Sequence, residues 1–158
     1  MTPLTSIVSG FAALAPGLKS IHALVRESRG RKRELLRELG HNIDKIAVFV
    51  EGGSDAERVD RVIASLETSC YEDASRAGFD LNTLKRSKLK ADLVKELPQF
   101  KPYVGMNTEE LFDKIYASIH RLKVIVSEYP NDSRFRKSVR LINILKLMLL
   151  LVRHIRSA

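Results

Sequence analysis

The sequence predicts an all-α fold: a single-domain antiparallel bundle of five or six helices over residues 1–158, with the C-terminal helix at its centre. Apolar residues recur every three or four positions through nearly the whole chain, which is the spacing of one helix face. The 158 residues include only eight Gly and five Pro, which disfavours a turn-rich all-β fold. The length is typical of one domain and sufficient to bury a sizeable core.

Two helices are expected in the first third of the chain. The first, over residues 4–25, keeps its apolar face across Pro16, and because proline removes a backbone donor we expect a kink there. A basic turn at Ser28–Arg31 separates it from the second helix, which Gly52–Gly53 ends. The apolar face of the second helix consists of Leu35, Leu36, Leu39, Ile43, Ile46, Ala47 and Val50.

Two further helices are expected before a loop. The motif at residues 54–57, Ser-Asp-Ala-Glu, is a capping box, in which a hydroxyl and a carboxylate satisfy free amide donors at a helix start. It predicts a third helix with an apolar face over Val59–Ala74, which Gly78 ends. A weaker fourth helix is expected over residues 81–97, followed by the loop at residues 98–106.

The last two helices differ in character. Asn107–Glu110 is a second helix-start signal, and the break at Pro130–Ser133 separates that helix from a final one over residues 133–156. Between Leu141 and Val152, ten of twelve residues are apolar, and a helix apolar on every side is normally the central one. The side chains expected to be nearly inaccessible to water are Ile142, Leu145, Met148, Leu149 and Val152.

Nothing in the sequence predicts catalysis, and we expect a protein that is not an enzyme. The single cysteine, Cys70, occupies an apolar position near acidic residues, which disfavour a reactive thiolate. Glu38-x-x-His41 has one spacing of a bundle-type metal site, but a di-metal site needs a second such pair, and the chain has none. We therefore expect no cofactor, no metal site and no small-molecule substrate.

The net charge of +8 is unevenly distributed. Residues 46–80 contain eight acidic and three basic residues, whereas residues 133–158 contain seven basic residues and no acidic one. One interpretation is that acidic and basic helices pair within the bundle. The other is that the basic surplus forms faces for an anionic partner. The residues expected to contact such a partner are Arg29, Arg31, Lys32, Arg33, Arg136, Lys137 and Arg140.

Nucleic acid and membrane are both open as anionic partners. The basic turn would hold phosphates without reading sequence, and the loop from Phe100 to Tyr103 offers rings on which an unpaired base stacks. Met1–Leu18 has no charged side chain and leads into the basic turn, a pattern that suits peripheral membrane contact. Neither Met1–Leu18 nor Leu141–Val152 reaches the ~20 apolar residues of a membrane-spanning helix.

The first part of the chain, about 50 residues, resembles the N-terminal helical bundle domains of the HeLo and MLKL type. In those domains, too, an apolar first helix leads through a short turn into a longer amphipathic helix. The resemblance implies a membrane-permeabilising role that the uncharged N-terminal helix would perform.

The sequence as a whole favours a non-enzymatic, cytoplasmic helical-bundle interaction module that binds a protein partner or a second copy of itself. The apolar surplus over Leu141–Val152 exceeds what one bundle helix needs, so we expect a homodimer formed through it. The alternatives are a membrane-interacting effector and a sequence-independent nucleic-acid-binding protein.

Overall fold

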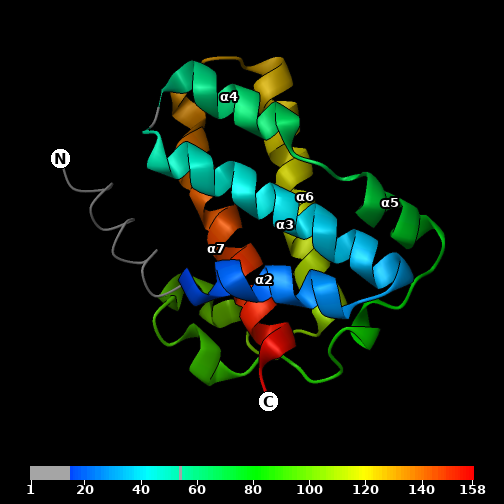
Figure 1. The fold of residues 1–158 in the computed structure, drawn as a ribbon. Helices are drawn as coiled ribbons and strands as arrows, with labels where there is room; N and C mark the ends of the chain where they lie inside the picture. The colour runs from blue at the N-terminus through cyan, green and yellow to red at the C-terminus, as the bar shows by residue number, and fades with distance from the viewer. Residues whose placement is uncertain (1–14, 54) are drawn as a thin grey trace.

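The computed structural model describes residues 15–53 and 55–158, and every regular element in these residues is a helix (Figure 1). The α-helices are α2 (Ala15–Glu27), α3 (Gly30–Glu51), α4 (Ala56–Ser65), α5 (Ser69–Arg76), α6 (Thr108–Glu128) and α7 (Lys137–Arg156). Short 3-10 helices lie between them: η1 (Leu81–Thr83), η2 (Ala91–Val94), η3 (Pro98–Tyr103) and η4 (Ser133–Phe135). The predicted all-α class is confirmed, and the pairs α2–α3 and α6–α7 run antiparallel.

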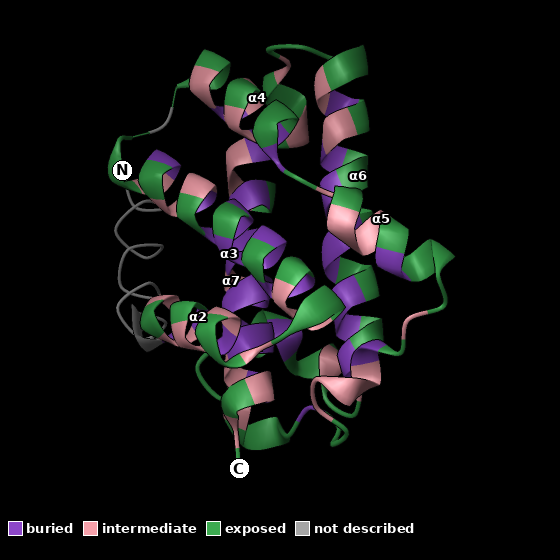
Figure 2. Cartoon of the chain, turned by 45° about the vertical axis from the view of Figure 1, so that its right-hand side comes forward, coloured by how far each residue is buried: buried purple, intermediate pink, exposed green. Residues whose placement is uncertain are grey.

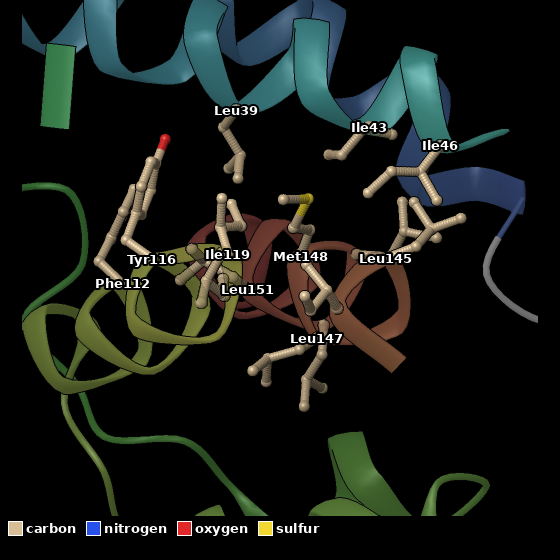
Figure 3. Packing of buried hydrophobic residues seen from close by; sticks show 14 of the residues in the cluster. Leu39, Ile43, Ile46, Phe112, Tyr116, Ile119, Leu145, Leu147, Met148 and Leu151 are labelled. Carbon is tan, nitrogen blue, oxygen red and sulfur yellow. The ribbon is translucent and has the colours of Figure 1, made fainter. Parts of the chain in front are cut away.

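Helix α7 lies at the centre of the bundle, as predicted. It packs against α2, α3, α4 and α6 and against η2, and buried residues concentrate on the faces turned toward it (Figure 2). Figure 3 shows Ile43 and Ile46 of α3 on one side of α7, while Leu147 projects from the other side. The side chains expected to be nearly inaccessible, Ile142, Leu145, Met148, Leu149 and Val152, are at most 5% exposed. Neighbours on all sides explain why this helix is apolar all round.

Helix α2 crosses α3 and α7 at short range because glycines lie at the two crossings. A Cβ atom on Gly17 would lie 3.1 Å from Leu149 Cδ2, and one on Gly40 would lie 3.3 Å from Ile21 Cγ1. Both distances are tighter than ordinary van der Waals contact, so a larger side chain at either position would push α2 outward. The kink predicted in the first helix depends on residues 4–14, which lie outside the described residues.

The prediction of one continuous third helix is wrong, because the chain turns at residues 66–68 and forms α4 and α5. Side chains of α3 hold this corner. The Asn42 amide accepts the Glu67 N–H (2.8 Å) and donates to the Glu67 carbonyl (2.7 Å). The buried Glu38 carboxylate accepts the N–H groups of Cys70 (2.7 Å) and Tyr71 (3.1 Å), and so caps the start of α5. Apolar spacing does not reveal the corner, since α4 and α5 both pack on α3.

Helix starts follow the predicted capping chemistry with one change. Residue 54 lies outside the described residues, and the N-cap of α4 is Asp55, whose carboxylate accepts the Glu57 N–H (2.8 Å). The predicted helix-start signal at Asn107–Glu110 is confirmed, and in the structure Asn107 and Glu110 form a reciprocal capping box at the start of α6. Short-range capping motifs therefore locate these helix starts to within about one residue.

The predicted fourth helix over residues 81–97 is wrong, since this segment and the loop after it form 3-10 helices only. Helix η1 packs against α6, and η2 packs against α7. The Leu89 N–H donates to the Met106 carbonyl, and the Leu89 carbonyl accepts the Gly105 N–H, both at 2.9 Å. The buried side chains of the segment are Leu81, Leu89, Val94, Leu97 and Phe100. Their irregular spacing suits a segment that follows the surface of α6 and α7 better than it suits one helix face.

Candidate partner-binding site

The seven basic residues predicted to contact a partner do not form one surface. The residues from Arg29 to Arg33 lie at the turn between α2 and α3, which is in the lower half of Figure 1. The residues from Arg136 to Arg140 lie at the start of α7, near the top of the same view. The two groups must therefore be considered as separate sites.

Lys137 is not available to a partner, which corrects its place among the predicted contact residues. Its side chain is 4% exposed, and its Nζ lies 3.0 Å from Asp60 Oδ1 and 2.8 Å from the Tyr129 carbonyl oxygen. Asp60 also accepts the Asn131 N–H (3.1 Å). Here Asp60 of the acidic segment 46–80 and Lys137 of the basic segment 133–158 pair inside the protein, in line with the interpretation that acidic and basic segments pair within the bundle.

The other two basic residues near the start of α7 are exposed. Arg136 has a left-handed backbone conformation (φ 50°) and joins η4 to α7, so α7 begins at residue 137 rather than at the predicted residue 133. The Arg140 Nε donates to the Phe135 carbonyl (2.8 Å). Arg140 also lines a pocket of about 180 Å³ together with Tyr103 of η3.

A second pocket, of about 560 Å³, lies beside the turn between α2 and α3, and we call it the α2–α3 pocket. Helix α2 ends at Glu27, and Gly30 begins α3 with a φ of 57°, a conformation that favours glycine. This turn places Arg29, Arg31 and Lys32 on the pocket wall. Arg29 and Arg31 are exposed to solvent, and Lys32 is half-buried. The apolar floor consists of buried or half-buried residues of separate segments, namely Leu24, Leu36, Phe79, Leu84 and Ile155.

The basic residues of the α2–α3 pocket carry uncompensated charge. Among the described residues, the side chains of Arg29, Arg31 and Lys32 have no hydrogen-bond or ion-pair partner. The one acidic residue of the pocket, Glu27, is paired with Arg156 (3.1 Å). Arg33 does not line the pocket, is half-buried, and has a buried Nε without a partner in the described part of the chain. Of the four basic residues predicted here as partner contacts, Arg29, Arg31 and Lys32 line the pocket and Arg33 does not.

Sequence reasoning found the basic rim of this pocket but missed its floor. Phe79 and Leu84 lie in connecting segments, and Ile155 lies in the last turn of α7. No spacing pattern links these residues, because each belongs to a different local element. Arg121 of α6, which lines the smaller pocket with Arg140, was missed as well, since it stands outside any basic run.

The buried polar groups around Glu38 stabilise the corner between α4 and α5 through hydrogen bonds. The Tyr116 hydroxyl donates to Glu38 Oε1 (2.9 Å), in addition to the two backbone N–H groups already described. Burial and the Glu38 carboxylate raise the pKa of the Cys70 thiol, which keeps it protonated. His41 Nδ1 lies 3.1 Å from Glu67 Oε2. The Glu38-x-x-His41 pair therefore engages two different sets of partners.

In the described ranges, no group of three or more His, Cys, Asp or Glu side chains is placed to hold a metal ion. None of the helices in those ranges combines the length and the apolar character that a membrane span requires. Comparison with protein-family models, curated proteins and solved structures finds no match to this chain. Its function must therefore be inferred from its own residues.

Proposed function

We propose that this protein is a non-enzymatic interaction module that binds an acidic segment of a protein partner in the α2–α3 pocket. The observation that carries the proposal is the combination of three unpaired basic side chains, Arg29, Arg31 and Lys32, with an apolar floor in one pocket. An apolar anchor side chain in a pocket supplies most of the binding energy at many interfaces. Complementary charges around the anchor supply specificity and speed of association.

The polar groups of the pocket favour a peptide over an acyl chain. Ser28 and Thr83 line it, and Glu27 adds a carboxylate that accepts hydrogen bonds. The Ser28 and Thr83 hydroxyls donate to the carbonyls of Leu24 (2.7 Å) and Asp80 (2.8 Å), and their oxygens can still accept hydrogen bonds from the N–H groups of a peptide backbone, which an acyl chain lacks. We therefore assign the pocket to a segment in which acidic residues flank a short apolar anchor.

The homodimer expected from the apolar surplus of α7 is left out of this proposal. The residues of that surplus are buried by the chain itself, including Leu147 at 4% exposure and Leu150 and Leu151 at 0%. The large apolar side chains that remain exposed in the described residues are Val48 of α3, Val104 after η3, and Val124 and Tyr129 at the end of α6. We expect light scattering to give a mass near 17.8 kDa, and twice that mass would restore the homodimer.

The proposal is tested by fluorescence anisotropy with a short synthetic peptide in which Asp and Glu flank a Leu-Phe pair. Two matched peptides replace either the Leu-Phe pair by Ser or the acidic residues by Lys. We expect only the acidic apolar peptide to bind. The variant R29E/R31E/K32E should weaken its affinity at least about tenfold, because each substitution replaces attraction by repulsion.

The matched control is R61E/K101E/K114E, which changes the net charge equally at exposed positions of α4, η3 and α6 outside the pocket. It should change the affinity less than about twofold, since distant exposed charges are screened by salt. Vesicles of phosphatidylserine and phosphatidylcholine and a single-stranded oligonucleotide complete the design. If either of these binds through Arg29, Arg31 and Lys32 while the peptide does not, the membrane or the nucleic-acid alternative replaces the protein partner.

A further inference from the structure

A smaller pocket on the opposite side of α7 from α3 brings together residues from three elements. Tyr103 and Phe100 come from η3, Arg121 comes from α6, and Arg140 and Asn143 come from α7. Leu147, which lines the pocket floor, projects away from α3 in Figure 3. The volume is about 180 Å³, and we call this site the tyrosine–arginine pocket.

Its aromatic wall is held in place by the core. The rings of Phe100 and Tyr103 are stacked, with centroids 5.8 Å apart and planes inclined by 19°. Phe100 is buried at 5% exposure, whereas Tyr103 is half-buried and lines the pocket. A ring fixed by a buried neighbour loses little freedom when a ligand stacks on it. The pocket therefore offers a preorganised surface to a planar group.

Its polar wall is basic. Neither Arg121 nor Arg140 has an acidic partner in the described residues, and no acidic residue lines the pocket. The hydrogen bond from Arg140 Nε to the Phe135 carbonyl orients the guanidinium and leaves its terminal NH₂ groups for another acceptor. Two guanidinium groups from neighbouring helices are suited to the oxygens of one phosphate. The exposed Asn143 amide adds both a donor and an acceptor.

We propose that the tyrosine–arginine pocket binds a nucleotide unit, with its base stacked on Tyr103 and its phosphate held by Arg121 and Arg140. The volume is below the roughly 300–1,000 Å³ of pockets that enclose a whole ligand, so it suits one planar ring with the phosphate outside. Stacking on an aromatic side chain tolerates any base. A free nucleotide and a nucleotide within a single strand present the same chemistry, and this site is independent of the α2–α3 pocket.

The test uses thymidine monophosphate and a short labelled oligothymidylate on the full chain, measured by calorimetry and by fluorescence anisotropy. We expect Y103L to weaken the affinity about tenfold, because it removes the stacking surface while keeping apolar bulk. Y103F keeps the ring and should bind as the wild type does. R121Q/R140Q should weaken binding about tenfold and flatten its salt dependence. Thermal unfolding checks that each variant is folded.

The control R37Q/R61Q removes the same charge from exposed positions of α3 and α4 that line neither pocket. If R121Q/R140Q and R37Q/R61Q lose the same affinity for the probes, binding depends only on the net charge of the protein, and the proposal is overturned. Unchanged binding by folded Y103L would overturn it as well. Variant-sensitive binding of the monophosphate identifies a free nucleotide as sufficient, and binding of the oligothymidylate alone identifies a strand. No detectable binding of either probe also rejects the proposal.

Discussion

The two basic segments of this protein look alike in sequence but have different surroundings in the structure. At the turn between α2 and α3, Lys32 borders a pocket and has no partner among the described residues. At the start of α7, Lys137 is buried against Asp60 and the Tyr129 carbonyl. The difference arises because α7 is central, so that its first turn lies between the middle of α4 and the end of α6. A basic run therefore indicates a binding surface only where no acidic neighbour folds onto it.

The largest contrast is expected in stability. Lys137→Met should lower the free energy of unfolding by about 3–5 kcal/mol, because it leaves the largely buried Asp60 carboxylate without its charge partner. Lys32→Met, at the other segment, should change it by less than about 0.5 kcal/mol. Urea unfolding of both variants measures the difference. Similar losses of unfolding free energy in Lys137→Met and Lys32→Met would show that Lys137 is no more important for stability than Lys32.

A second prediction tests the central position of α7, which explains why Lys137 at its start is buried. Leu145 is fully buried, and Leu145→Ala should cost about 2–5 kcal/mol through lost apolar contact and the cavity left behind. Val124, which is 61% exposed on α6, provides the control, and Val124→Ala should leave the midpoint of thermal unfolding nearly unchanged. An unchanged midpoint of thermal unfolding for Leu145→Ala would contradict the central position of α7.

Helix α3 shows both behaviours along its own length. Its first turn carries unpaired basic residues, whereas Asn42 further on makes two hydrogen bonds to Glu67 at the corner between α4 and α5. Asn42→Ala should therefore cost about 1–3 kcal/mol, because it removes both hydrogen bonds of a fully buried amide. The exposed Asp44 on the same helix is the control, and Asp44→Ala should have little effect. Faster hydrogen exchange at Glu67 in Asn42→Ala alone would locate the loss at the corner.

The smallest expected effect concerns the end of α7. Burial, and then the charge of Lys85, lowers the pKa of His154, which lies 3.2 Å from the Thr108 hydroxyl. His154 therefore binds a proton more readily in the unfolded chain than in the folded one. The contribution of the neutral His154 to folding stability is complete above the unfolded pKa of about 6.5 and is lost as the pH falls below that value. The midpoint of thermal unfolding should fall more between about pH 7.5 and pH 5.5 in the wild type than in His154→Gln.

The exposed His22 is the matched control for this pH dependence. His22→Gln should keep the pH response of the wild type. If His154→Gln responds to pH as the wild type does, His154 does not contribute the expected stabilisation.

The two candidate sites show which of their residues can be predicted from sequence patterns and which cannot. The basic run predicts Arg29, Arg31 and Lys32 as contact residues, and the aromatic residues of the loop predict stacking by Phe100 and Tyr103. The apolar floor of the α2–α3 pocket and the neighbour Arg121 of Arg140 were not predicted. These groups are assembled from segments far apart in the chain, and one sequence contains no record of which segments meet.

Features that depend on close neighbours along the chain can be predicted from the amino-acid sequence. The all-α class, the start of α6 at Asn107 and the burial of α7 follow from apolar periodicity and capping, which act within about one or two helical turns. Three features could not be predicted in this way: the corner at residues 66–68, the 3-10 path of residues 81–103 and the pairing of Lys137 with Asp60. Each of these depends on hydrogen bonds or burial contributed by a distant segment, and such contributions override local propensity because they satisfy groups that the local segment cannot.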